Sequence, residues 1–255
     1  MKRDQETINK RHEQLIELLN ERKEMKVDEI AQIFNTSLMT TRRDLQALEE
    51  KGNLERFHGG CRIKKKSRSA QEQEIMECRD RISRYAAGLV NDGDSLFING
   101  SMTASGILEY LCARQITVIT NNAFAAGYIQ KEDIDMYLTG GQLKSHIMVG
   151  DYCLRNLLSS YVKKAFLGCT GISSNGEILC DIPSELGINE TMISHAEEYY
   201  ILADHTKIGK STSAGSFSLQ QKGTLITDTK ADQTILQVLE QKGMRVILVD
   251  PEKNS

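Results

Sequence analysis

The hydrophobic pattern of the first 50 residues predicts three short helices. Apolar side chains recur every three or four positions in residues 12–22, HEQLIELLNER, and in residues 27–34, VDEIAQIF, which is the spacing of an amphipathic helix. Asn35 favours the left-handed conformation that ends a helix, and Ser37 is a natural N-cap for the next one. Two helices separated by about three residues are typical of a helix-turn-helix.

The third helix is expected to present two arginines on its exposed side. At about 100° per residue, Thr41, Leu45 and Leu48 share one face, which should be buried. Arg42 and Arg43 lie on or beside the opposite face, near the start of the helix, where the helix dipole disfavours cations. In helix-turn-helix proteins this region enters the major groove, where arginine donates two hydrogen bonds to guanine.

The two arginines also have a purely structural interpretation. They could pair with Asp44, with Glu49 or with solvent, and their charge alone gives both interpretations equal weight. Residues 1–70 carry 16 Lys and Arg against 12 Asp and Glu, a formal charge of +4, whereas the remainder carries −7. A basic N-terminal part joined to an acidic body weakly favours a small nucleic-acid-binding unit.

A β-hairpin is expected after the third helix. Residues 54–58, LERFH, alternate in side-chain direction, and Gly59 with Gly60 can supply the positive φ angles of a tight turn. Such a wing would carry Arg56 and His58 along phosphates or the minor groove.

The next segment, residues 61–70, has five basic residues and no apolar periodicity. It is typical of a flexible basic linker. We therefore expect a DNA-binding domain over 1–61, a linker over 62–74 and a larger domain over 75–255.

From about residue 71, short apolar strands alternate with helical stretches, which favours a mostly parallel sheet with both faces covered. Helices are expected over 75–90, 104–114, 123–130, 185–196 and 231–243. Strands are expected over 95–99, 116–120, 134–139, 165–172, 199–204, 224–227 and 245–250.

Polar and mostly glycine-containing loops follow these strands, and ligands of open α/β sheets bind beyond the carboxyl ends of strands. Backbone amides together with Ser101 and Thr103 suit a phosphate, and Lys207 and Lys210 are available cations. Each loop alone could be an ordinary turn, but five converging loops favour an anion site. Their residues are 99–105, 121–122, 140–144, 168–176 and 204–212.

Composition excludes several classes of protein. The 255 residues suggest one or two domains, and no apolar run of about 18 residues predicts a membrane span. The charged N-terminus, MKRDQETINK, does not resemble a secretory signal, so a cytoplasmic protein is expected. The six cysteines are scattered without zinc-ligand spacing, as are His146, His195 and His205, so we expect neither a metal nor a cofactor.

Residues 27–60 resemble the winged helix-turn-helix of the DeoR family of bacterial transcriptional regulators, and the resemblance extends over nearly the whole chain. The sequences TTRRDL, at 40–45, and HGG, at 58–60, are similar to the family's Thr-Ile-Arg-Arg-Asp-Leu core and His-Gly-Gly wing tip. The resemblance implies binding to a double-stranded DNA operator. The implied contacts are Ser37, Leu38, Met39, Thr40, Arg42, Arg43, Arg56, His58, Gly59 and Gly60.

The second half resembles the family's sensor domain, which is related in fold to ribose-5-phosphate isomerase and commonly responds to phosphorylated sugars or related metabolites. The elements VITNN, LTGG, AFLGCTGI and LADHTKIGKST carry this resemblance. Together with the loop after the first strand, it implies an effector site. Its expected residues are Asn99, Gly100, Ser101, Thr103, Asn121, Gly140, Gly141, Asp204 and Lys207.

Two regions depart from the family pattern. In the first loop, Asn99 replaces the usual acid and Ser101 stands where a glycine is usual, which weakens the expectation of phosphate at this loop. In the recognition region, Thr36 and Thr41 occupy usually aliphatic positions. Exposed Leu38 and Met39 there suggest a distinct operator sequence.

The resulting prediction is a DNA-binding regulator, a repressor of a carbohydrate operon that a phosphorylated metabolite releases. It should act as a dimer or larger homo-oligomer, because one short helix reads few base pairs. The alternative is a sugar-phosphate isomerase with an attached DNA-binding domain, which requires a general base. The related isomerases carry two carboxylates where this chain has GCTG at 168–171, and the possible substitutes are Asp181, Glu185 and Asp204.

Overall fold

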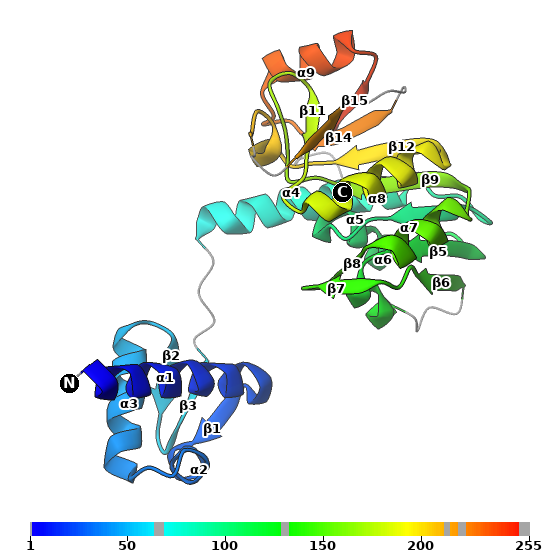
Figure 1. Ribbon diagram of the computed structural model, residues 1–255. Helices are drawn as coiled ribbons and strands as arrows, with labels where there is room; N and C mark the ends of the chain where they lie inside the picture. Colours follow the sequence, from blue (N-terminus) through cyan, green and yellow to red (C-terminus); the bar gives the residue numbers. More distant parts are fainter. Residues whose placement is uncertain (1, 64–68, 129–132, 212–214, 219–222, 250–255) are drawn as a thin grey trace. The chain divides into compact units, whose positions relative to one another are not determined.

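The structure is a computed structural model that describes residues 2–63, 69–128, 133–211, 215–218 and 223–249 (Figure 1). The chain divides into two compact units, Met1–Ser69 and Ala70–Ser255. Within the described ranges, no helix is long and apolar enough to span a membrane.

The N-terminal unit packs three helices on a small antiparallel sheet with the strand order β1-β3-β2. The first helix begins ten residues before the predicted one, and the three-residue strand β1 was not predicted. The apolar faces meet in one core that includes Leu15, Leu19, Leu45 and Leu48. The elements are α1 (Lys2–Arg22), β1 (Glu24–Lys26), α2 (Val27–Ile33), α3 (Leu38–Glu50), β2 (Leu54–Phe57) and β3 (Gly60–Ile63).

Local sequence signals set the start of α3 as predicted. Asn35 has a φ of 48°, which lets the chain turn sharply after α2. Ser37 caps α3, and its hydroxyl accepts a hydrogen bond from the Thr40 amide at 3.1 Å. Thr41 and Leu45 are buried, which fixes the opposite side of the helix toward solvent.

The linker is shorter than the predicted 62–74. Residues 62–63 belong to strand β3, and the first helix of the second unit, α4 (Ala70–Ala87), already begins at Ala70. Most of the basic residues expected there fall in 64–68, outside the described residues.

The second unit is built on a seven-stranded, all-parallel sheet in the order β15-β14-β12-β9-β4-β5-β6. Its strands are β4 (Ser95–Ile98), β5 (Ile116–Thr120), β6 (Ile134–Leu138), β9 (Val162–Gly168), β12 (Ala196–Leu202), β14 (Thr224–Asp228) and β15 (Arg245–Val249). The predicted alternation of strands and helices is thus confirmed.

Side-chain alternation along the strands separates two apolar layers. In β4, Leu96 and Ile98 pack with α4 and two short helices, whereas Phe97 packs on the opposite face with three others. The first group comprises α4, α5 (Met102–Ser105) and α6 (Ile107–Tyr110); the second comprises α7 (Asp151–Leu158), α8 (Pro183–Ser194) and α9 (Gln233–Gln241).

Several local elements differ from the prediction. The helix expected over 104–114 is divided into α5 and α6, and the one expected over 123–130 is the 3₁₀ helix η1 (Ala123–Tyr128). The strand expected over 165–172 ends at Gly168. Helix α7, the hairpin β7 (Gln142–Lys144) and β8 (Ile147–Val149), and the small sheet β10 (Gly171–Ile172), β11 (Glu177–Leu179) and β13 (Ser216–Ser218) add elements that were not predicted as such.

The strand order reverses between β4 and β9. From β4 the next strands along the chain, β5 and β6, lie on one side, whereas β9 is followed by β12, β14 and β15 on the other. Such a switch point leaves a crevice at the carboxyl ends of the two central strands. The loops after β4 and β9 are therefore brought together.

Candidate functional site

Asp44, the acid that follows Arg42 and Arg43 on α3, is held by side chains of helix α1. Arg11, on α1, donates to the carboxylate of Asp44 from Nε at 2.7 Å and from Nη2 at 3.1 Å. His12 Nε2 lies 3.1 Å from the same carboxylate. Asp44 thus links α1 to α3, and Arg11 of α1 compensates its negative charge.

The second acid, Glu49, is held by the hairpin. It accepts a hydrogen bond from the backbone N–H of Arg56 at 2.9 Å, and the Arg56 Nη1 atom lies 3.8 Å from its other oxygen. Within the described part of the chain, no ion pair joins Arg42 or Arg43 to a carboxylate. The pairing of these arginines with Asp44 or Glu49 is therefore wrong, and both side chains are exposed.

Two apolar side chains stand beside these arginines. Met39 is 63% exposed and Leu38 is 45% exposed at the first turn of α3. Thr40 is half-buried, and its hydroxyl lies 2.9 Å from that of Ser37. The start of α3 thus presents both cationic and apolar groups to solvent.

The hairpin turn uses its two glycines differently from the prediction. Phe57 pairs with Gly60, so His58 and Gly59 form the loop, and both are exposed. Gly59 has a φ of +87°, whereas Gly60 has no positive φ and is buried. A Cβ on Gly60 would lie 2.6 Å from the Met25 carbonyl oxygen, so this glycine serves close packing and is not an exposed contact.

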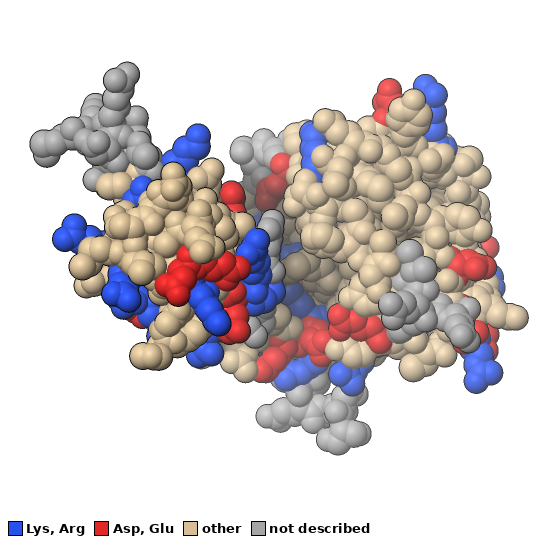
Figure 2. All heavy atoms as spheres, turned by 90° about the horizontal axis from the view of Figure 1, so that it is seen from below, with Lys and Arg blue, Asp and Glu red and all other residues tan. Residues whose placement is uncertain are grey.

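Charge is mixed rather than segregated on the face shown in Figure 2. Lys and Arg side chains lie beside Asp and Glu side chains on both units. On this face the case for a DNA interface therefore depends on particular arginines that lack a carboxylate partner.

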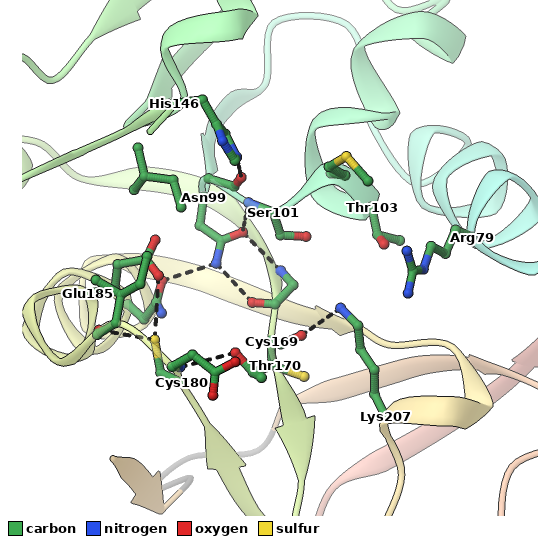
Figure 3. A pocket seen from close by; sticks show the side chains of 17 residues that line it. Arg79, Asn99, Ser101, Thr103, His146, Cys169, Thr170, Cys180, Glu185 and Lys207 are labelled. Atoms are coloured by element: carbon green, nitrogen blue, oxygen red, sulfur yellow. Dashed lines mark hydrogen bonds between the residues drawn. The ribbon is translucent and has the colours of Figure 1, made fainter. Parts of the chain in front are cut away.

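A cavity of about 400 Å³ occupies the switch point between β4 and β9 (Figure 3). It is bounded by the loops after these strands, by α4, by the β7–β8 hairpin and by the start of α8. The lining residues are Arg79, Asn99, Gly100, Ser101, Met102, Thr103, His146, Ile147, Gly168, Cys169, Thr170, Cys180, Asp181, Ile182, Glu185, Asn189 and Lys207.

Asn99 joins the two central loops through its amide. Its Oδ1 accepts from the Gly168 N–H at 2.9 Å and the Ser101 N–H at 3.2 Å, while its Nδ2 donates to the Gly168 carbonyl at 2.9 Å. Nδ2 also donates to Asn189 Oδ1 at 3.1 Å. An amide can donate and accept at once, whereas a carboxylate could not donate to these oxygens, so asparagine suits this position.

Two cations reach the cavity from different elements. Lys207, in the 3₁₀ helix η2 (His205–Lys207), donates from Nζ to the Cys169 carbonyl at 2.6 Å. Arg79, on α4, donates from Nε to Asp204 at 2.7 Å. Burial opposes ionisation of Asp204, but hydrogen bonds from Thr206 and Arg79 and the nearby positive charges outweigh it and lower the pKa of this carboxyl.

Four of the nine predicted effector residues do not line the cavity. Asp204 is fully buried, and it reaches the cavity only through its hydrogen bond with Arg79. Asn121 is fully buried and hydrogen-bonds to Met148 through its backbone carbonyl and its side chain, at 2.8 and 3.2 Å.

The two remaining residues are Gly140 and Gly141, which turn the chain from β6 toward β7 with φ angles of +68° and +113°. A Cβ on Gly141 would lie 2.5 Å from the Val149 carbonyl oxygen. Like Asn121, these residues support the β7–β8 hairpin, and that hairpin carries His146 to the cavity wall. The other five predicted residues, Asn99, Gly100, Ser101, Thr103 and Lys207, line the cavity together.

Arg79 and His146 line the cavity but are not among the residues predicted from the sequence, and Glu185 is predicted there only as a possible base. Arg79 lies on the same face of α4 as the buried residues Ser83 and Ala86. A lone arginine on a buried helix face is a sequence pattern that can indicate a functional residue. His146 follows no predicted strand, so the sequence held no comparable signal for it.

The cysteines of the cavity are thiols at neutral pH. Burial raises the pKa of Cys169 to about 11 and that of Cys180 to about 12. A thiol with so high a pKa is a poor nucleophile.

Another cluster joins ligand-type atoms that are distant in sequence. One atom each of Cys78, His205 and Asp228 lie within 4.8 Å of one another. The carboxylate of Asp228 already accepts hydrogen bonds from the backbone N–H groups of His205, at 2.7 Å, and Lys230, at 3.0 Å. These bonds explain the cluster as a structural turn after β14.

Comparison with known proteins places both units in one family. Residues 74–229 match the family described as the DeoR C terminal sensor domain, and residues 11–67 match the DeoR-like helix-turn-helix domain. The HTH-type transcriptional repressor GlcR of Bacillus subtilis (strain 168) is 30% identical over 247 residues, which are 94% of this chain and 95% of that protein.

Other relatives have similar coverage. The lactose phosphotransferase system repressor of Streptococcus mutans is 30% identical, with 88% of this chain and 94% of that protein aligned. The glycerol-3-phosphate regulon repressor of Escherichia coli (strain K12) is 27% identical, with 90% and 94% aligned. Among solved structures, ribose 5-phosphate isomerase from Plasmodium falciparum is 15% identical with a TM-score of 0.38, covering 52% of this chain and 53% of that one. Matches of both units, and of repressors along nearly their whole length, show that the chain belongs to the DeoR family of transcriptional regulators and is a regulator rather than an enzyme.

Proposed function

We propose that this protein is a sequence-specific repressor of a carbohydrate-metabolism operon, which a phosphorylated sugar or related anionic metabolite releases from its operator. The named relatives include repressors of a lactose phosphotransferase system and of a glycerol-3-phosphate regulon. The observation that carries the effector part is the placement of Arg79 and Lys207 at one cavity in the switch point of the sheet.

The proposed DNA contacts begin at α3. Arg42 and Arg43 are exposed and free of carboxylate partners in the described residues, so both can donate to guanine or phosphate. Ser37, Leu38, Met39 and Thr40 surround them in the first turn. His58 and Gly59 at the tip of the hairpin, with Arg56 beside it, would contact the DNA backbone or minor groove.

The proposed effector site uses donors that the fold leaves available. Arg79 donates a hydrogen bond to Asp204 from its Nε atom only. Lys207 donates one of its three ammonium protons to the Cys169 carbonyl. Among the described contacts, the terminal Nη atoms of Arg79 have no partner. Together with Ser101 and Thr103, these groups offer a phosphate both charge and directed hydrogen bonds.

The position of Arg79 in the chain supports the proposed release from DNA. It lies on α4, which begins directly after the segment that joins the two units. An anion that draws Arg79 away from Asp204 would act on this helix, and it must favour the state with lower DNA affinity. A homo-oligomer would place two recognition helices on symmetric half-sites.

A thermal-shift screen of phosphorylated sugars against the full chain tests the effector site, because a ligand that binds the native state raises its melting temperature. We expect at least one sugar phosphate to raise the melting temperature, and Lys207→Gln to abolish most of the shift. Lys210→Gln is the matched control, since Lys210 is exposed in the same loop and does not line the cavity. Equal shifts in both variants would contradict the proposed site.

A further inference from the structure

Glu185 is a buried acid on the cavity wall without a basic partner among the described residues. It lies in the first turn of α8 and is 8% exposed. Its Oε2 accepts a weak hydrogen bond from the Cys180 thiol at 3.5 Å. Burial raises the pKa of Glu185, and the thiol hydrogen bond and the field of His146 only partly oppose this effect.

The cavity is electrically bipolar. Figure 3 shows Arg79 and Lys207 on one side of it and Glu185 on the other, with Asn99 and Ser101 between them. The cationic side suits the phosphate of the proposed effector. On the acidic side, no ion pair joins Glu185 to a Lys or Arg of the described residues, although both Arg79 and Lys207 line the same cavity.

A buried carboxyl without a counter-charge is costly, and a ligand that brings that charge recovers part of the cost. An ammonium group would convert Glu185 into a paired carboxylate. A hydroxyl group at the same place would supply a hydrogen bond but no charge. The wall therefore discriminates between an amine and an alcohol.

We infer that Glu185 selects an effector with an amino group as well as a phosphate, as in an amino sugar phosphate. This inference rests on the proposed function, because it assigns the opposite end of the ligand to Arg79 and Lys207. The cavity volume of about 400 Å³ is of the size that accepts a small ligand such as a monosaccharide phosphate.

The test is calorimetric titration of the full chain with matched ligand pairs: glucosamine 6-phosphate against glucose 6-phosphate, and galactosamine 6-phosphate against galactose 6-phosphate. In at least one pair the amino compound should bind about tenfold more tightly or better. Glu185→Gln should reduce this ratio to near one. Glu190→Gln, which changes an exposed glutamate of the same helix, should leave the ratio unchanged.

Equal or tighter binding of the hydroxyl compound in every pair would overturn the inference, as would an unchanged ratio in Glu185→Gln. If Glu185→Gln does not fold, Glu185→Asp takes its place, because this variant keeps the carboxylate but moves it back by one methylene. An unchanged affinity ratio in Glu185→Asp also overturns the inference. Binding of both members with equal affinity leaves the proposed function standing. Binding of no sugar phosphate at all overturns both.

Discussion

The carboxylate of Asp44 is held by Arg11 from α1, with Oδ2 2.7 Å from Arg11 Nε, and not by its neighbour Arg43. This pairing leaves Arg43 exposed for another partner. We expect Arg43→Ala to reduce operator affinity by about 1–3 kcal/mol and to relax specificity at one base pair, with little loss of stability. Fluorescence anisotropy with matched and mismatched duplexes, selected from a random library, measures this effect.

Two controls accompany Arg43→Ala. Lys51→Ala, just beyond the other end of α3, should leave DNA binding unchanged. Arg11→Ala should lower the free energy of unfolding by about 2 kcal/mol, because it removes hydrogen bonds to a charged group. An equal loss of affinity on all sequences, with a shallower salt dependence, would make Arg43 a phosphate contact instead.

Exposed Leu38 and Met39 predict that the operator presents thymine methyl groups to the start of α3. Replacing the contacted thymines by uracil should weaken binding by about 0.5–1 kcal/mol per methyl. Met39→Ala should bind more weakly and lose most of its sensitivity to uracil. Undiminished sensitivity in Met39→Ala would exclude this residue as the reader of those methyl groups.

Gly168 and Ser101 should be strongly coupled. A Cβ on Gly168 would lie 1.8 Å from Ser101 Oγ and 2.3 Å from Ser101 Cβ, while its next neighbour is 3.7 Å away. Gly168→Ala alone should destabilise the protein by about 1–3 kcal/mol through overpacking. In a Ser101→Gly background the same change should cost much less, and chemical denaturation of the four proteins in a double-mutant cycle gives the coupling energy. Additive effects would show that the loops separate more easily than this packing implies.

The paired carboxylate of Asp204 should contribute stability that depends on pH. Because its pKa is lowered in the folded state, the contribution is present above the unfolded pKa of about 3.9 and is lost as the pH falls through the lower folded value. Arg79 is 30% exposed, so screening by water limits the effect.

We therefore expect Asp204→Asn to lower the free energy of unfolding by about 2 kcal/mol at pH 7. The difference from wild type should shrink below about pH 4. Urea denaturation at several pH values measures it, with Asp135→Asn as the control at an exposed strand position. A difference that is constant over the acid range would refute this role for the pair.

The sequence predicted features that depend on local pattern and on strand topology. The cap at Ser37, the turn at Asn35 and the buried face of α3 follow from short-range physics. The meeting of Asn99 with Gly168 follows from the rule that carboxyl ends of parallel strands share one edge. The features that could not be predicted from the sequence depend on tertiary packing.

Three parts of the structure illustrate this dependence. The helix expected over 104–114 is divided at Gly106, where a Cβ would lie 2.8 Å from the Ser83 hydroxyl of α4, a close helix contact that the local sequence pattern does not reveal. Similarly, Arg79 reaches the cavity from the side of a helix rather than from a strand end. Three of the predicted residues, Asn121, Gly140 and Gly141, follow strands as expected. They support the β7–β8 hairpin and do not line the cavity.

In the proposed mechanism, an anion bound by the sensor unit releases the DNA held by the helix-turn-helix. Its most direct test is fluorescence anisotropy of a selected operator duplex, titrated with the full chain in the presence and absence of the sugar phosphate that gives the largest thermal shift. We predict that the ligand lowers operator affinity of the wild type at least tenfold, a coupling of about 1.4 kcal/mol, and has little effect on Arg79→Gln. The same operator affinity with and without bound ligand in the wild type would show that the effector does not release the DNA.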